Sequence, residues 1–116
     1  MHASWSGRAV GANRRLRPGK ARWYKDPAYR AFQDSLTGTL LAARPKEPIR
    51  GKAKLYLRLS IGRRRDWDSL IKPVCDCLQT ARIVEDDRQI RGRIVVDVED
   101  HGHGEPDRIY LEVERA

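Results

Sequence analysis

The sequence has few cysteines that could form disulfides and no segment that would place the protein in a membrane. Its 116 residues include only two cysteines, Cys75 and Cys77, which point in different directions on a predicted helix and cannot bridge each other there. No CxxC or Cys/His zinc pattern occurs. The sequence also lacks a long apolar run, a signal-like start and an internal repeat. We therefore expect a protein of a reducing, cytoplasmic setting with no membrane association.

Acidic residues are absent from positions 1–25, although the chain has 16 Asp and Glu in all. The same stretch carries the basic residues Arg8, Arg14, Arg15, Arg17, Lys20, Arg22 and Lys25. With a net charge of +8 and a pI near 10.0, this composition favours a polyanionic partner. Residues 1–25 are thus predicted to form a basic N-terminal arm for phosphate backbones. The alternative is a solubilising, partly disordered tail.

The length predicts one small domain spanning residues 1–116, with a single core. Asp26-Pro27 is a strong helix start, and helical spacing continues to about Ala43. Period-two alternation predicts a strand over 53–61, and a second helix is expected over 67–80. Two more strands follow, joined by an exposed hairpin loop at 101–106. The first carries Ile90, Ile94, Val96 and Val98 on one side. The second has Ile109, Leu111 and Val113 facing inward. A short strand at 5–10 is also expected.

This order predicts an α+β fold in which two helices pack on a small mixed sheet of three to four strands. A sheet this small leaves edges that need cover, so a homodimer is expected.

Two carboxylates lie where the strand at 53–61 gives way to the second helix. Three arginines, Arg63, Arg64 and Arg65, run directly into Asp66 and Asp68, and Lys72 follows four residues later. A second acidic pair, Asp86-Asp87, lies downstream. Like charges this close raise one another's pKa unless a cation sits between them. Mg²⁺ prefers carboxylate and phosphate oxygens, and arginines bind phosphate, so the pattern indicates metal-dependent phosphodiester chemistry.

A simpler interpretation of the same residues stays open. Asp66 or Asp68 could be a helix N-cap, and Asp68 with Lys72 could be a surface ion pair of little energetic value. The chain would then be a non-catalytic nucleic-acid-binding protein. A small RNA-binding or ribosome-associated protein would fit the pI but would leave the acidic residues unexplained.

The run RRRDWDSLIKP, followed by EDDRQI, resembles the RusA family of Holliday junction resolvases. That family carries a D-x-D-N-x-x-K motif at a helix start and then a D-D-x-Q turn before a strand. Asp66, Asp68 and Lys72 match the first motif, and Asp87 matches the second. The segment 11–14 resembles the family's Pro-Pro-Ser-x-Asn-Arg segment, although the Pro-Pro-Ser is missing. Ser69 stands where the family has Asn.

The resemblance implies a phage- or bacterium-encoded, homodimeric and Mg²⁺-dependent endodeoxyribonuclease. Such enzymes resolve four-way DNA junctions by paired symmetric nicks in recombination and repair, with no small-molecule cofactor. Asp66, Asp68 and Asp87 are then the expected metal ligands, and Lys72 is the fourth catalytic residue. The expected contacts to branched DNA are Asn13, Arg14, Arg15, Arg17, Lys20, Arg63, Arg64 and Arg65.

Overall fold

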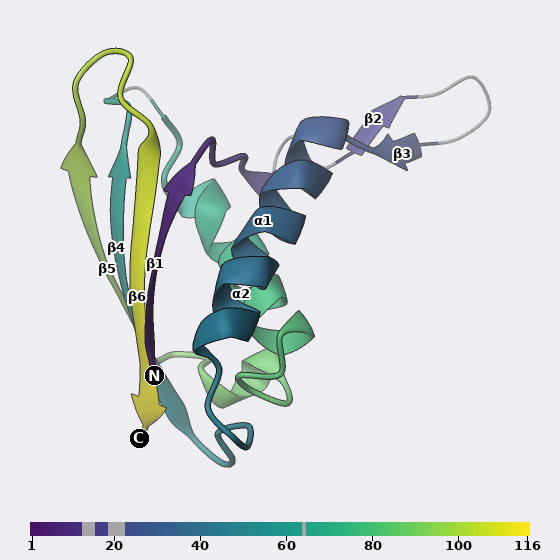
Figure 1. Cartoon of the computed structure of the whole chain (residues 1–116), viewed down its shortest axis with the longest axis vertical. Coiled ribbons are helices and arrows are strands. Elements are labelled where there is room, and N and C mark those ends of the chain that lie inside the picture. The colour runs from purple at the N-terminus through teal and green to yellow at the C-terminus, as the bar shows by residue number, and fades with distance from the viewer. Residues whose placement is uncertain (13–15, 19–22, 64) are drawn as a thin grey trace.

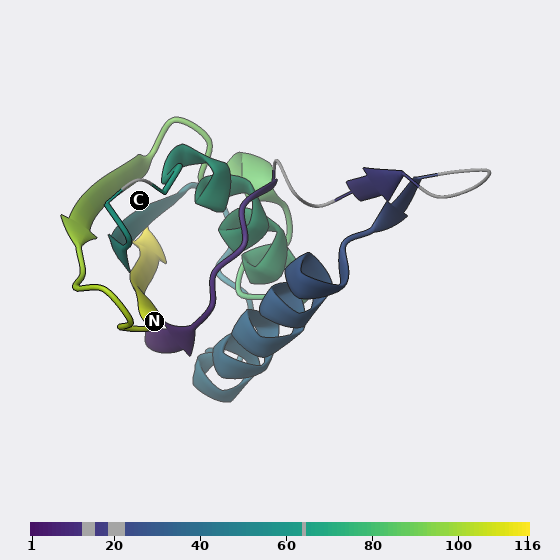
Figure 2. The same ribbon diagram turned by 90° about the horizontal axis from the view of Figure 1, so that it is seen from above.

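A four-stranded sheet forms one layer of the molecule and two helices form the other (Figures 1 and 2). The computed structural model describes residues 1–12, 16–18, 23–63 and 65–116. The strands of this sheet are β1 (His2–Gly7), β4 (Ala53–Ile61), β5 (Ile94–Asp100) and β6 (Asp107–Arg115). The helices α1 (Pro27–Ala43) and α2 (Ile71–Thr80) cover one face. The predicted α+β fold with a mixed sheet and two helices is confirmed.

The strand order is β1-β6-β4-β5, with β4 parallel to β5 and antiparallel to β6. Parallel neighbours need a long crossover, and α2 provides it between β4 and β5. The predicted terminal hairpin is therefore wrong, because β4 lies between β5 and β6. The loop at 101–106 passes from one side of β4 to the other.

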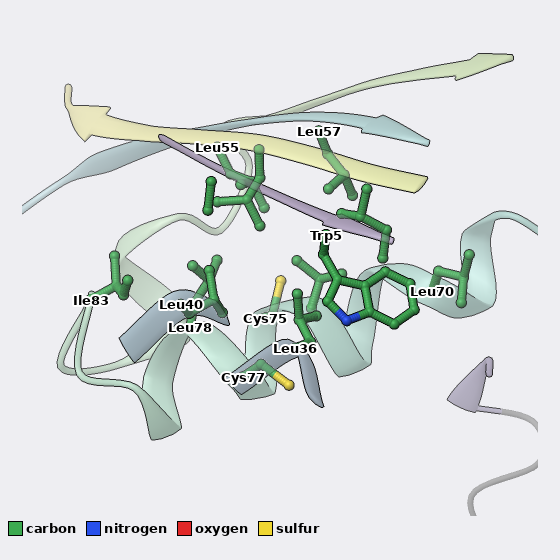
Figure 3. Close-up of a cluster of buried hydrophobic side chains, with 14 of the residues drawn as sticks. Trp5, Leu36, Leu40, Leu55, Leu57, Leu70, Cys75, Cys77, Leu78 and Ile83 are labelled. Carbon is green, nitrogen blue, oxygen red and sulfur yellow. The ribbon is translucent and has the colours of Figure 1, made fainter. Parts of the chain in front are cut away.

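The core lies between the two layers and follows the predicted patterns closely. Leu55, Leu57 and Leu59 of β4 are essentially inaccessible to solvent, as alternation on a half-buried strand requires. They meet Leu36 and Leu40 of α1, as Figure 3 shows for the labelled side chains. Burying leucines of this size stabilises a fold by about 1.5–3 kcal/mol each, and this apolar layer fixes the sheet against the helices.

Helix α1 begins and ends where the sequence predicts. The Asp26 carboxylate accepts hydrogen bonds from the backbone N–H of Ala28 at 2.8 Å and of Tyr29 at 3.3 Å. This N-cap satisfies donors that have no partner inside the helix. The helix stops at Ala43, two residues before Pro45.

Helix α2 begins later than the predicted Trp67. A 3₁₀ turn, η2 (Asp68–Leu70), comes first, and the α-helix starts at Ile71. Pro73 explains the shift, because it then falls in the first helical turn, where its missing N–H costs no hydrogen bond.

The predicted basic arm divides into two parts. Strand β1 belongs to the sheet, where it pairs with β6, and both Ala9 and Val10 are buried. The expected strand at 5–10 thus starts earlier and ends at Gly7. Beyond it, β2 (Leu16–Pro18) and β3 (Trp23–Lys25) pair antiparallel and extend away from the body (Figures 1 and 2). We call these two strands the β2–β3 ribbon.

Strand β5 lies at the sheet edge and does not bury its predicted face completely. Val98, expected to face inward, is 40% exposed, and Val95 is 60% exposed. Ile90 is buried but precedes the strand. An edge strand has only one neighbour to cover its side chains. Within the described residues, no helix is both long and apolar enough to cross a membrane.

Candidate active site

The carboxylate pair lies on the short connection between β4 and α2. Asp66 and Asp68 are both exposed, and Trp67 between them is 43% exposed. The Ser69 hydroxyl donates a hydrogen bond to the Asp66 carbonyl oxygen at 2.8 Å. Ser69 therefore supports the turn that presents the pair.

The two carboxylates act on each other. The pKa of Asp66 is raised by its hydrogen bond with the Asp68 carboxyl group, and further by desolvation and by repulsion from the Asp68 charge. One shared proton is how two close carboxylates avoid bearing two full charges. A divalent cation bound by both carboxylates offsets the same repulsion, and Mg²⁺ commonly binds through one or two carboxylates plus phosphate oxygens. The donor chemistry of the pair therefore fits Mg²⁺.

Lys72 lies one turn into α2 and pairs with Asp76. Its Nζ is 3.4 Å from Asp76 Oδ1, and its side chain is 51% exposed. The surface ion pair considered for Asp68 and Lys72 is thus formed instead between Lys72 and Asp76. Asp76 was not among the predicted site residues, although its i,i+4 spacing from Lys72 is a sequence signal for such a pair.

The second acidic turn separates into a structural and an available carboxylate. Asp86 caps the 3₁₀ turn η3 (Asp87–Gln89) in a capping box with Gln89. Its hydrogen bonds with the Arg88 side chain and backbone lower the pKa of Asp86 to about 2. Asp86 is therefore committed to holding the turn, and this leaves the exposed Asp87 as the carboxylate able to bind a ligand.

Asp87 lies against α2. Its backbone N–H donates to the Gln79 side chain at 3.1 Å, and it lines a small surface pocket with Cys75. Burial first, and then the charges of Asp87 and Asp76, raise the pKa of the Cys75 thiol to about 11, while the charge of Lys72 lowers it. All three charged groups act on this one thiol, so Asp87 of η3 and Lys72 of α2 both lie near Cys75.

The structure places the predicted catalytic residues in two sets and not in one complete set of metal ligands. No three His, Cys, Asp or Glu side chains in the described ranges are placed to hold a single metal ion. Asp66 lies with Asp68, while Asp87 lies with the Lys72–Asp76 pair beside Cys75. The three-carboxylate set of Asp66, Asp68 and Asp87 stays a prediction.

The predicted DNA contacts fall into four groups. Arg63 is exposed beside the carboxylate pair. Arg65 is turned toward the body, where its guanidinium lies 3.1 Å from the buried Asp107. Arg17 lies in β2, opposite Tyr24. The remaining predicted contacts lie outside the described residues; these are Asn13, Arg14, Arg15, Lys20 and Arg64.

The sequence analysis missed Asp107 and His101 as interacting residues. Asp107 is 4% exposed although its chain position follows an exposed loop. His101 Nε2 lies 2.8 Å from Asp107 Oδ1. A lone Asp at the start of an amphipathic strand carries no sequence signal for such a contact.

A small α+β domain with a net charge of +8 and a carboxylate pair between a strand and a helix fits a nuclease. The family model described as endodeoxyribonuclease RusA matches residues 8–114, nearly the whole chain. The chain therefore belongs to the RusA endodeoxyribonuclease family. A search of curated proteins found no match.

Family membership establishes the general activity. The protein is an endodeoxyribonuclease of the Holliday junction resolvase type, and it binds branched DNA. RusA nucleases come from bacteria or phages and are generally dependent on divalent metal.

Proposed function

We propose that the protein resolves four-way DNA junctions in the bacterial cytoplasm by paired symmetric nicks that depend on Mg²⁺. The observation that carries this proposal is the pair of exposed carboxylates, Asp66 and Asp68, on the connection between β4 and α2. Two close carboxylates repel each other, and a divalent cation bound between them would offset that repulsion.

In this proposal Asp66, Asp68 and Asp87 hold the metal together with oxygens of the DNA phosphate. When bound by these residues, Mg²⁺ would polarise the scissile phosphate and lower the pKa of an attacking water. Asp87 joins from η3, which Asp86 and Gln89 keep in place through the capping box. The oxygen-only donor set supports Mg²⁺ over softer metals.

Lys72 offsets negative charge that develops on the phosphate and on the leaving oxygen. Its half-exposed ammonium supports this role, since it is free to leave Asp76 for a stronger anion. Arg63 and Arg64, together with the basic residues around the β2–β3 ribbon, bind flanking phosphates. Such contacts position the DNA without reading its sequence, so recognition is of junction shape and backbone.

We propose that the enzyme acts as a homodimer, so that two sites cut symmetric strands. Both β1 and β5 are edges of the sheet, and Val95 and Val98 of β5 are exposed. An edge strand with apolar side chains is a surface that association would cover.

Cleavage of a labelled synthetic four-way junction, with Mg²⁺ or with EDTA, tests the function directly. A linear duplex of matching sequence is the control. We expect paired nicks near the crossover that require Mg²⁺ and are absent from the duplex. Tight junction binding without cleavage in any divalent metal would make the protein a nucleic-acid-binding member of its family that has lost the chemistry.

A further inference from the structure

A buried carboxylate, Asp107, collects three hydrogen bonds from three separate parts of the chain. It accepts from the backbone N–H of Ala9 at 2.9 Å, from Arg65 Nη1 at 3.1 Å and from His101 Nε2 at 2.8 Å. Arg65 also donates through Nη2 to the Ala9 carbonyl oxygen. We call these four residues the Asp107 network.

The network joins the segments that surround the active site. Asp107 is the first residue of β6, and His101 follows the last residue of β5. Ala9 follows β1 on the way to the β2–β3 ribbon, so the network clamps both its backbone N–H and its carbonyl. Arg65 is the residue directly before Asp66.

Local contacts carry this restraint into the carboxylate pair. The Arg65 backbone N–H donates to the Gly62 carbonyl oxygen at 2.9 Å and closes a turn after β4. A Cβ atom at Gly62 would lie 3.3 Å from Arg65 Cγ and 3.8 Å from His101 Cε1, so the network packs directly on this turn. With Ser69 bound to the Asp66 carbonyl, Asp66 is held from both sides.

The side chains of the Asp107 network are largely buried, so their contacts are part of the folded structure and not chance contacts at the surface. The side chains of Asp107 and His101 are 5% and 12% exposed, and that of Arg65 is 39% exposed. A buried carboxylate without partners would be strongly unfavourable. The planar guanidinium of Arg65 donates to two acceptors of the protein, the Asp107 carboxylate and the Ala9 carbonyl. A lysine cannot reproduce this two-point geometry.

We propose that Arg65, His101 and Asp107 are positioning residues that set the place of Asp66 and of the chain leading to the β2–β3 ribbon. This inference rests on the proposed nuclease site. Arg65 then affects cleavage by keeping Asp66 in place. It does not make the direct phosphate contact that its position in the triple arginine predicts. Misplacing a reacting group by about 1 Å can cost on the order of 100-fold in rate.

Two variants test the role, each with a matched control at the far end of β6 from Asp107. Asp107→Asn keeps the shape but removes the charge, and Arg65→Lys keeps the charge but removes the fork. Glu114→Gln and Arg115→Lys make the same chemical changes at exposed positions of β6. For each protein, single-turnover cleavage at saturating junction DNA and Mg²⁺ is measured beside the junction Kd in Ca²⁺ without Mg²⁺.

We expect Asp107→Asn and Arg65→Lys each to lower the single-turnover rate by about 10- to 100-fold. The junction Kd should stay within about threefold, and the double variant should be no slower than the slower single variant, because both changes break one network. The two controls should leave rate and Kd unchanged. A raised Kd with an unchanged rate at saturation for Arg65→Lys would overturn the proposal and make Arg65 a phosphate contact.

Amide hydrogen exchange of the free, metal-free protein gives a readout independent of catalysis. Exchange at 62–68 should accelerate in Asp107→Asn and Arg65→Lys but not in the controls, while the amides of α1 stay protected. Unchanged exchange at 62–68 would overturn the positioning role. If the wild-type protein fails to cleave junctions, the proposed function fails, and this exchange measurement still decides the role of the network.

Discussion

Lys72 forms its ion pair with Asp76, one turn further along α2, where Nζ lies 3.4 Å from Oδ1. Because both side chains and Asp87 act on the thiol of Cys75, the ammonium stands on the side of α2 that η3 approaches. The pair is substantially exposed and so contributes little to stability. Its significance lies in where it holds the ammonium before DNA binds.

Lys72→Ala and Asp76→Asn remove the same ion pair from opposite ends. We expect each to change the free energy of unfolding by less than about 0.5 kcal/mol. Lys72→Ala should nevertheless reduce junction cleavage strongly, on the order of 100-fold, because it removes charge stabilisation at the phosphate. Asp76→Asn should retain cleavage. Denaturant unfolding and single-turnover nicking measure both effects, and equal loss of cleavage in the two variants would argue for a purely structural role of the pair.

Asp68→Asn should separate binding from cleavage. The substitution removes one anionic metal ligand, so cleavage should fall by more than about 100-fold, beyond the usual effect of losing an outer-shell partner. Junction affinity should be kept or improved, since a carboxylate no longer repels the phosphate. Gel-shift and nicking assays on one preparation provide the test. A variant that cleaves at the wild-type rate would exclude Asp68 as a metal ligand.

Mg²⁺ should stabilise the protein in the absence of DNA. A ligand that binds only the folded state adds RT ln(1 + [L]/Kd), which is about 1.4 kcal/mol at ten times Kd. Thermal melting with Mg²⁺ or EDTA should therefore show a higher Tm with metal. The shift should vanish in Asp66→Asn and persist in Glu114→Gln. The same shift in both variants would locate the bound ion away from the carboxylate pair.

The His101 contact predicts a pH-dependent contribution to stability. Its hydrogen bond to Asp107, and then that to the Gly102 carbonyl, raise the pKa of His101 above the ordinary value of 6.5. The protonated ring donates to both acceptors, so folding is favoured most when it is charged. This contribution is fully present below the unfolded pKa and is lost as the pH rises through the higher folded pKa.

Denaturant unfolding of His101→Gln against wild type, at about pH 5.5 and about pH 9, measures that contribution. The loss of stability should be larger at the lower pH. His103→Gln, on the exposed part of the same loop, is the matched control. A loss that is equal at both pH values, or larger at pH 9, would contradict the assignment of a charged His101 to the network.

Local patterns in the sequence predicted most of the fold. The Asp26-Pro27 start and the alternation over 53–61 gave correct bounds for α1 and β4, because capping and burial act on neighbours in the chain. The strand order could not be predicted from these local patterns. Whether β5 pairs with β4 or with β6 depends on how the connection through α2 passes over the sheet. The ribbon was missed because its strands are only three residues each.

The candidate site shows the same division between local and distant information. Spacing alone predicted that Asp66 and Asp68 would lie close together, and the effect of Asp68 on the pKa of Asp66 agrees with it. The partner of Arg65 could not be predicted, because Asp107 is 42 residues away in the chain. The position of Asp87 relative to the pair likewise depends on tertiary packing.

The place of β6 between β1 and β4 has a consequence for biosynthesis. The first strand finds its neighbour only in the last strand, and the Met1 amine itself bonds to the Val113 carbonyl at 2.8 Å. Such distant pairings are slow to form, and a nascent chain that lacks β6 has neither a continuous sheet nor Asp107 behind the loop at 62–66. The sheet can therefore be completed only after β6 has been synthesised.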